Sequence, residues 1–385
     1  MNGAVIDAVD VRLLAVPLPA YMHGSGYRSI NVPFVTLRDS DGRAATGFCY
    51  SLDIGTQLVC DMVEKVIGPA IVGRTAAEWD AVADEVAAGT RRLGATVFTA
   101  ALSAVDIAVW DLRGLTAATP IATLLGHAGG PVPFYGSGRG GHNFDVEELV
   151  LQSLSYVADG FAAVKLSVGA LPPDADTARV RAVREALGPA VPMMVDASER
   201  LTLPEALALG RRLDEFGLVW FEEPLLAEDL DGYRILSTSL ATPIATGEHI
   251  QQLEVFARYL RETAVGFLQP DAALGGGITR MVRVAALAEA HHRPLAWHSL
   301  ADLHVHLAAA FGGTAYIEDF PILDGIIAEP LRPEGGLARP PRRPGHGIRW
   351  DHEAIERHTA RRITVTRSAT ERHDGHELQS EGARR

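Results

Sequence analysis

The stretch PMMVDASERLTLPEALALGRRLDEFGLVWFEEP, residues 192–224, decides the fold of this chain. It opens with a short apolar run at 192–196, continues with Leu and Ala at helical spacing over 203–216, and closes with a second apolar run at 218–222. A strand, a helix and a further strand in this order are typical of a βα unit in a parallel sheet.

The same unit repeats along most of the chain. Apolar runs of strand length recur at regular intervals, and helical segments lie between most of them. Strands that alternate with helices in this way are the sequence signature of a TIM-type barrel, so we predict an α/β barrel. The predicted strands cover residues 132–135, 162–168, 192–196, 218–222, 243–247, 265–269, 294–298 and 315–319.

The part of the chain before this barrel has a different pattern, with three strands followed by helices. This order predicts a separate α+β domain of about the first 125 residues. The chain ends in a polar stretch, and we expect its last residues to be disordered. The predicted strands and then helices of the first part cover residues 4–16, 32–37, 45–50, 56–67, 75–88 and 95–115.

The composition sets limits on the function. With 385 residues the chain is large enough for two domains, and its formal net charge of −13 disfavours binding to nucleic acid. Two cysteines, Cys49 and Cys60, are too few for a disulfide framework or a cysteine-based metal site. The sequence shows neither a signal peptide nor a transmembrane segment, so we expect a cytoplasmic protein without a membrane partner.

Charged residues stand at the ends of the predicted barrel strands. In barrels of this type the carboxyl ends of the strands carry the chemistry. One such residue would be explained as the cap of the next helix, but seven in succession at the same end predict an active site. Strands two to eight end, in order, in Lys165, Asp196, Glu222, Glu248, Asp271, His298 and Glu318.

Three of these residues predict a metal site. Asp196, Glu222 and Glu248 follow adjacent strands, and three carboxylates held close together repel one another unless a cation lies between them. Oxygen ligands favour Mg²⁺, with Mn²⁺ as a further option, over zinc. Three protein ligands leave positions open for water and a substrate, so we predict a catalytic metal site.

Two further residues predict an acid–base pair. A carboxylate at Asp271 that accepts from one ring nitrogen of His298 fixes the tautomer and raises the basicity of the other nitrogen. His298 is therefore the candidate general base. We expect the neighbouring histidines to be structural or exposed to solvent: His291, His292, His304 and His306.

The ordered set of motifs resembles the mandelate racemase-like branch of the enolase superfamily. The resemblance implies a modified (β/α)7β barrel over 129–320, an α+β capping domain over 1–128, and a C-terminal segment over 321–365 that returns to the capping domain, with a disordered tail over 366–385. It also implies a homo-oligomer. The motifs that carry it are AVDIAVWD (104–111), GFAAVK (160–165), MVD (194–196), FEEP (221–224), GE (247–248), QPDA (269–272) and WH (297–298).

The resemblance assigns roles to the strand-end residues. Asp196, Glu222 and Glu248 would bind Mg²⁺, which would hold a small carboxylate substrate and stabilise the enediolate that forms when the α-proton leaves. Lys165 would place a cation on one carboxylate oxygen. Glu318 would donate a hydrogen bond to another, as a neutral acid. Asp271 and His298 would move the proton.

The sequence departs from the family at one catalytic position. The family's second barrel strand usually ends in Lys-x-Lys, whereas this chain has Lys165-Leu166-Ser167. A serine hydroxyl is too weak a base to replace the second lysine, so a two-base racemisation is disfavoured. We therefore predict syn-dehydration of a sugar acid to a 2-keto-3-deoxy acid, with His298 as both base and acid. Ser167 and Ser198 are candidates to bind the substrate, although Ser198 would serve equally well as a helix cap.

A loop of the capping domain is expected to set the specificity. In the family it closes over the substrate, and the matching segment here is about 19–32. Arg28 could reach a distal carboxylate and His23 could supply a proton, or both could face solvent. Glycines among the polar residues suit a mobile lid, and the polar and aromatic residues of the loop are Tyr21, His23, Tyr27, Arg28 and Asn31.

Two alternatives to the dehydratase remain open from the sequence. One is an isomerase of the same superfamily, namely a cycloisomerase, epimerase or racemase that acts on a carboxylate or lactone. The other is a catalytically silent barrel, which only the missing lysine supports. The intact metal carboxylates and acid–base pair argue against the silent barrel.

Overall fold

The computed structural model describes residues 3–52, 55–126, 130–139 and 141–366. Within them, parallel strands β4 to β11 form a closed barrel, because β11 pairs with β4 through Ile317 and Phe134. The short strand β12, Leu337–Ala338, pairs antiparallel with β4. The barrel strands are β4 Val132–Gly136, β5 Ala163–Ser167, β6 Met193–Asp196, β7 Phe221–Glu222, β8 Ile244–Thr246, β9 Phe267–Leu268, β10 Leu295–Trp297 and β11 Thr314–Asp319.

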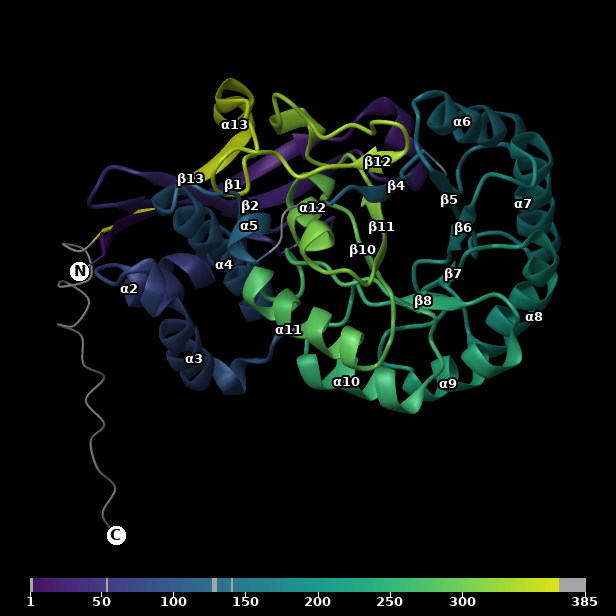
Figure 1. The fold of residues 1–385 in the computed structure, drawn as a ribbon, viewed down its shortest axis with the longest axis horizontal. Coiled ribbons are helices and arrows are strands. Elements are labelled where there is room, and N and C mark those ends of the chain that lie inside the picture. Colours follow the sequence, from purple (N-terminus) through teal and green to yellow (C-terminus); the bar gives the residue numbers. More distant parts are fainter. Residues whose placement is uncertain (1–2, 53–54, 127–129, 140, 367–385) are drawn as a thin grey trace, which may run out of the picture.

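One helix follows each of the strands β4 to β10 and lies on the outside of the barrel (Figure 1). Capping boxes begin two of these helices, with Asp145 and Glu148 at α6 and Thr202 and Glu205 at α8. Strands and helices therefore alternate as predicted, and the (β/α)7β fold class is confirmed. The helices are α6 Val146–Ala158, α7 Pro173–Leu187, α8 Leu203–Leu213, α9 Leu230–Ser239, α10 Leu253–Glu262, α11 Gly277–Ala290 and α12 Ala301–Ala310.

The interior of the barrel explains which residues reach its mouth. A fully buried apolar layer fills the barrel, and because side chains on a strand alternate, the residue two positions later points to the same side. Five of the six layer residues are thus followed by a polar mouth residue, while the sixth, Ala245, is followed by Gly247. The five pairs are Tyr135 and Ser137, Ala163 and Lys165, Met194 and Asp196, Trp220 and Glu222, and Ala296 and His298.

A second region covers the barrel and is called the capping region here. It consists of a four-stranded antiparallel sheet in the order β13-β1-β2-β3. Helices α1, α2 and α4 pack on this sheet, and α3 packs on α2 and α4. Strand β13 comes from the end of the described chain and pairs with β1, for example Val365 with Val9. The elements are β1 Ile6–Pro17, β2 Ser29–Asp39, β3 Ala44–Phe48, α1 Gln57–Met62, α2 Gly68–Ile71, α3 Trp79–Thr90, α4 Thr96–Thr116 and β13 Thr359–Thr366.

Helix α4 joins the capping region to the barrel through α11 (Figure 1). The buried carboxylate of Asp106 accepts hydrogen bonds from the indole of Trp79 at 2.7 Å and from the backbone N–H of Thr279 at 3.0 Å. Gly277 has φ 84°, and a Cβ there would lie 2.3 Å from Asp106 Oδ1, so only glycine allows this approach.

The remaining elements are short helices within these two parts and between them. The predicted tail, 366–385, lies outside the described residues apart from Thr366. Within the described part of the chain, no helix has the length and apolar character needed to span a membrane. The short helices are η1 Ala20–Ser25, η2 Val63–Ile67, η3 Ala76–Glu78, η4 Arg91–Leu93, α5 Ile121–Leu124, η5 Asp214–Phe216, η6 Asp324–Ile326 and α13 His352–His358.

Candidate active site

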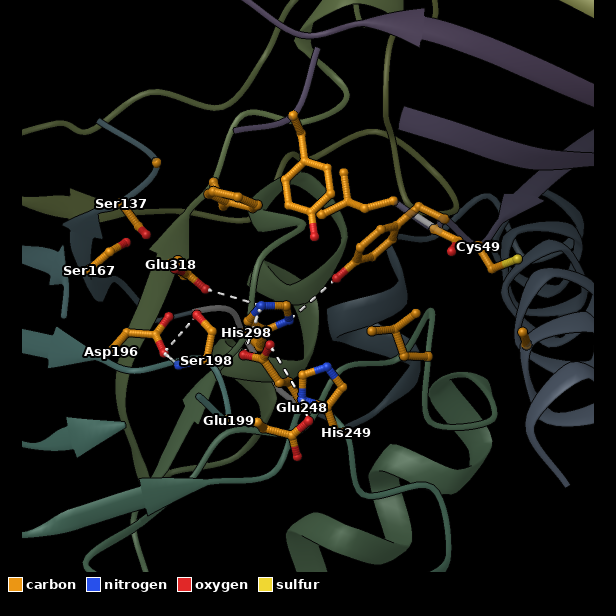
Figure 2. A pocket seen from close by; sticks show the side chains of 18 of the residues that line it. Cys49, Ser137, Ser167, Asp196, Ser198, Glu199, Glu248, His249, His298 and Glu318 are labelled. Carbon is orange, nitrogen blue, oxygen red and sulfur yellow. Dashed lines mark hydrogen bonds and ion pairs between the residues drawn. The ribbon is translucent and has the colours of Figure 1, made fainter. Parts of the chain in front are cut away.

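A cavity of about 540 Å³ lies between the barrel mouth and the capping region. The barrel contributes strand-end residues, and the capping region contributes Tyr27, Tyr50 and a group of apolar side chains near Cys49. Figure 2 shows Ser137, Ser167, Asp196 and Ser198 on one side of His298, and Cys49 on the other. Five of the seven predicted strand-end residues therefore line one cavity. The other two, Glu222 and Asp271, contact lining residues, namely Lys165 and His298.

Lys165 is the central cation of the mouth. Its ammonium group forms ion pairs with Glu222, with Glu318 at 2.8 Å and with Asp196 at 3.6 Å. Burial alone would lower the pKa of Lys165, but the charges of Glu222 and Glu318 raise it well above its ordinary value. Lys165 therefore carries a positive charge toward the cavity.

The three predicted metal ligands come from β6, β7 and the turn after β8. Glu222 Oε2 accepts hydrogen bonds from Trp220 Nε1 at 2.7 Å and Gln269 Nε2 at 2.6 Å, which fix its orientation. Burial raises the pKa of Glu222 to about 7, although Lys165 opposes the rise. Burial also raises the pKa of Glu248. These carboxylates therefore lie in a site where a cation would stabilise their charged forms.

Asp271 and His298 form the predicted hydrogen-bonded pair. His298 Nδ1 donates to Asp271 Oδ2 at 2.9 Å, while Asp271 Oδ1 accepts from the backbone N–H of Ala273 at 2.7 Å. His298 Nε2 faces the cavity and lies 3.0 Å from Glu248 Oε2. Burial lowers the pKa of His298, but Glu248 and Asp271 outweigh it and raise the pKa to about 10. Because the charge of Glu248 is the largest of the raising causes, a cation bound at Glu248 would favour the neutral imidazole that a general base requires.

His304 connects the two loops that carry this pair. The backbone N–H of Ala272 donates to His304 Nε2 at 2.9 Å, and His304 Nδ1 donates to the carbonyl of Ser299 at 3.0 Å. Burial lowers the pKa of His304, so the ring is neutral and can accept at one nitrogen while it donates from the other. His304 thus links the loop after β9 to the loop after β10 through these two hydrogen bonds.

The surroundings of Glu318 favour its charged form. Burial raises the pKa of its carboxyl group, but Lys165 and His298 outweigh burial and lower the pKa to about 2. Glu318 Oε2 also accepts a hydrogen bond from the backbone N–H of Ser299 at 2.8 Å. The role of Glu318 as a neutral acid toward a substrate stays a prediction.

Three serines line the side of the cavity that faces His298. Ser198 donates to Asp196 Oδ1 through both its backbone N–H, at 2.7 Å, and its hydroxyl, at 3.2 Å. The cap of the following helix is Thr202, so Ser198 does not serve in that role. Ser137 was not predicted, although the strand alternation from Tyr135 could have indicated it.

The lid residues predicted to touch the substrate lie elsewhere. His23 Nε2 lies 3.1 Å from the carbonyl oxygen of Leu18, and the side chain of Arg28 is exposed. Among the described residues that line the cavity, the lid contributes Tyr27 and neither His23 nor Arg28. The backbone N–H of Leu18 donates to the carbonyl of Arg28, and this hydrogen bond joins the two ends of the loop.

Arg200, which the sequence did not single out, lines the cavity. It follows two residues in the left-handed region, Ser198 at φ 44° and Glu199 at φ 60°, and this strained turn after β6 brings it to the rim. Its guanidinium donates to the carbonyl of Ala197 at 3.2 Å. Among the residues that the structure describes, no carboxylate forms an ion pair with Arg200.

Tyr50 is another residue that the sequence pattern did not identify. It follows β3 in the capping region, and its hydroxyl donates to Asp271 Oδ2 at 2.8 Å. Because it is separated from Asp271 by most of the chain, no strand-end spacing could indicate this contact.

A second group of possible ligands borders the site. Ligand atoms of Glu199, Glu223 and His249 lie within 4.8 Å of one another. His249 Nδ1 donates to Glu223 Oε2 at 2.7 Å, and although burial lowers its pKa, Glu223 and Glu248 raise it to about 11. In this structure these residues form a charged hydrogen-bonded group beside Glu248.

The residues fit a hard divalent cation at the predicted position. Asp196, Glu222 and Glu248 supply only oxygen atoms, which is the donor chemistry that Mg²⁺ prefers. Trp220 and Gln269 orient the carboxylate of Glu222 by hydrogen bonds to its Oε2, as residues around a metal site commonly do for metal ligands.

Comparison with known proteins identifies both halves of the chain. Residues 8–126 match the N-terminal domain of mandelate racemase/muconate lactonizing enzyme, and residues 148–354 match the enolase C-terminal domain-like family. Over 92% of this chain and 99% of the relative, the sequence is 34% identical to 3,6-anhydro-alpha-L-galactonate cycloisomerase of Streptomyces coelicolor. Over 78% of this chain and 75% of the relative, it is 33% identical to L-talarate/galactarate dehydratase of Salmonella typhimurium.

Solved structures give the same result. The crystal structure of L-talarate dehydratase from Polaromonas sp. JS666, complexed with Mg and L-glucarate, matches with a TM-score of 0.87 and 32% identity, over 94% of this chain and 99% of that one. L-talarate/galactarate dehydratase from Salmonella typhimurium LT2, liganded with Mg and L-lyxarohydroxamate, matches with a TM-score of 0.89 and 29% identity, over 94% of this chain and 95% of that one.

Proposed function

The chain belongs to the mandelate racemase/muconate lactonizing enzyme family of the enolase superfamily, and from this premise we propose that it is a magnesium-dependent dehydratase of a sugar acid. The relatives named as dehydratases of sugar acids support the reaction class. The observation that carries the proposal is an imidazole base on one side of the cavity and serine hydroxyls on the other.

The barrel topology places these two sides across from each other. The strands follow one another in order around the barrel, so β6 and β10 are four strands apart in a ring that closes between β11 and β4. Ser198 follows β6 and His298 follows β10. Ser167, at the end of β5, likewise lies across from Asp271, which follows β9. The substrate would therefore meet a base on one face only.

The substrate carboxylate would bind at the positive end of this cavity. A divalent cation held by Asp196, Glu222 and Glu248 would neutralise the charge that builds up on the carboxylate oxygens when the α-proton leaves. Lys165 would pair with one of these oxygens, since its ammonium group is charged and faces the cavity. The hydroxyls of Ser137, Ser167 and Ser198 would bind substrate hydroxyls on the opposite face.

His298 would carry out both proton transfers. Its Nε2 removes the α-proton, and Asp271 stabilises the resulting imidazolium through the Nδ1–H bond of 2.9 Å. The electron pair of the broken C–H bond first moves into the carboxylate and gives an enediolate. It then forms the C2–C3 double bond as the C3–O bond breaks. The imidazolium returns the proton to the departing hydroxyl, so water leaves from the same face. The enol that remains tautomerises to the 2-keto-3-deoxy acid.

A cycloisomerase would use the same metal ligands and the same pair without loss of water, and one relative carries that name. To separate the two, a pooled library of sugar acids and their lactones is incubated with enzyme and Mg²⁺ in D₂O and followed by mass spectrometry. A product lighter by one water, with deuterium at C3, supports the dehydratase. A rearranged product of unchanged composition, apart from deuterium, contradicts it.

The same proposal includes a cytoplasmic location and a homo-oligomeric state. Both cysteines, Cys49 and Cys60, are free and buried, as is usual in a reducing compartment. Helix α6 exposes the apolar side chains of Val146, Leu151 and Leu154 on the outside of the barrel, which would suit contact between subunits. Light scattering on the purified protein measures the oligomeric state directly.

A further inference from the structure

We propose that Tyr50 of the capping region is a positioning residue of the acid–base pair, which it completes by holding the oxygen of Asp271 that binds His298. The inference rests on the proposed function and goes beyond it, because it makes the capping region part of the proton-transfer machinery. The capping region would then do more than shape the cavity.

The contacts around Asp271 carry the proposal. Asp271 Oδ2 accepts two hydrogen bonds, from His298 Nδ1 at 2.9 Å and from the hydroxyl of Tyr50 at 2.8 Å. Asp271 Oδ1 accepts from the backbone of Ala273. Both oxygens are thus held from fixed directions, and the carboxylate cannot rotate without breaking one of these bonds. The Tyr50 oxygen also lies 3.4 Å from His298 Nδ1, so it packs directly against the ring edge.

The position of Tyr50 is fixed by the capping sheet. The residue before it, Cys49, donates its backbone N–H to Pro33 at 3.1 Å, and the residue after it, Ser51, exchanges two backbone hydrogen bonds with Asn31 at 2.9 and 3.0 Å. Pro33 and Asn31 belong to β2, the strand that forms the end of the predicted lid segment and continues beyond it. Correct docking of this sheet on the barrel therefore determines where the Tyr50 hydroxyl lies, and with it the orientation of Asp271 and His298.

Tyr50 acts as a donor. Its side chain is 7% exposed, and burial together with the charge of Asp271 raises its pKa well above the ordinary value. The hydroxyl therefore keeps its proton. The Tyr50 hydroxyl has two opposing effects on the pair. It competes with His298 for Asp271 Oδ2, which weakens the bond to His298, but it also orients this oxygen toward the imidazole ring. We expect the orienting effect on catalysis to be larger, because the ring must present Nε2 to the substrate.

The test compares Tyr50→Phe with Tyr233→Phe in the full-length protein with Mg²⁺. Tyr233 is buried in the barrel and donates to the carbonyl of Leu225 at 2.8 Å, so its variant loses the same kind of hydrogen bond away from the cavity. For Tyr50→Phe we expect kcat and α-proton exchange to fall about tenfold with KM changed less than about twofold. For Tyr233→Phe we expect both parameters to stay unchanged. An equal effect in the two variants, or a raised KM at unchanged kcat, would overturn the proposal.

A second measurement does not depend on turnover. The His298 Nδ1 proton, bonded to a carboxylate, should give a strongly downfield ¹H NMR signal, which His298→Asn identifies by removing it. We expect the signal to exchange with water faster in Tyr50→Phe and to be unchanged in Tyr233→Phe. An unchanged signal in both contradicts the proposal. If the wild type converts no acid in the library, the proposed function fails, while this measurement still decides the role of Tyr50.

Discussion

The two sides of the cavity differ in how completely their polar atoms are bonded. On the histidine side, Asp271 and His298 are held by hydrogen bonds from the barrel and from the capping region. On the serine side, within the described residues, the hydroxyls of Ser137 and Ser167 have no hydrogen-bond partner. A fixed pair suits proton transfer, whereas free hydroxyls suit the recognition of a polyhydroxy substrate.

The largest expected effect comes from removal of the base on the histidine side. In His298→Asn, the side chain keeps a donor to Asp271 but loses the nitrogen that removes and returns the proton. We expect kcat to fall roughly 10⁴-fold, since one residue performs both transfers. Steady-state kinetics on the identified acid measures the effect. A variant with near wild-type kcat would place the base on the serine side.

Loss of a metal ligand should give the next largest effect. Glu222→Gln keeps the size of the side chain and removes one negative charge from a site that is fully buried. We expect Mg²⁺ affinity to fall roughly 100-fold, as measured by isothermal titration calorimetry. Activity of the wild type should vanish with a chelator and return with Mg²⁺. Glu223→Gln, in the neighbouring charged group, is the control that should keep Mg²⁺ affinity within about tenfold.

Addition of a base to the serine side tests the comparison directly. In Ser167→Lys, a base would face the substrate from β5, opposite the pair. We expect the variant to exchange the α-proton with D₂O in unreacted substrate, and to lower dehydration by about tenfold or less. Mass spectrometry and NMR of recovered substrate detect the exchange. Ser167→Ala should show none, and exchange in both variants would mean that His298 alone accounts for it.

The smallest effect concerns the rim of the cavity. Arg200 lines it without a carboxylate partner in the described structure, whereas Arg28 is exposed away from it. We expect Arg200→Ala to raise KM for a sugar diacid about tenfold and Arg28→Ala to change it less than about twofold. A larger effect of Arg28→Ala would show that the lid moves over the substrate when it binds.

The barrel and the residues at its strand ends could be derived from the sequence because both depend on patterns within short stretches of the chain. One strand, one helix and one terminal polar residue recur within short intervals, and alternation along each strand fixes the side that the residue faces. The same rule, applied from Tyr135 and Phe267, would also have indicated Ser137 and Gln269.

Contacts between distant segments could not be derived in this way. Tyr50 reaches Asp271 from another region of the molecule, and the charge of Glu318 depends on its distance from Lys165. Which lid residue faces the cavity depends on how the loop folds back on Leu18. The sequence analysis singled out Arg28 and His23, whereas Tyr27 lines the cavity. Such relations follow from packing and not from periodicity.

The pairing of β13 with β1 has a consequence for the order in which the protein is made. Strand β1, Ile6–Pro17, is synthesised before the barrel, whereas its neighbour β13, Thr359–Thr366, is synthesised after the barrel. Until then one edge of the capping sheet is open to other chains. Synthesis of the capping sheet thus begins before the barrel and ends after it. A nascent chain that stalls within the barrel would therefore expose an unpaired edge strand to chaperones and to aggregation.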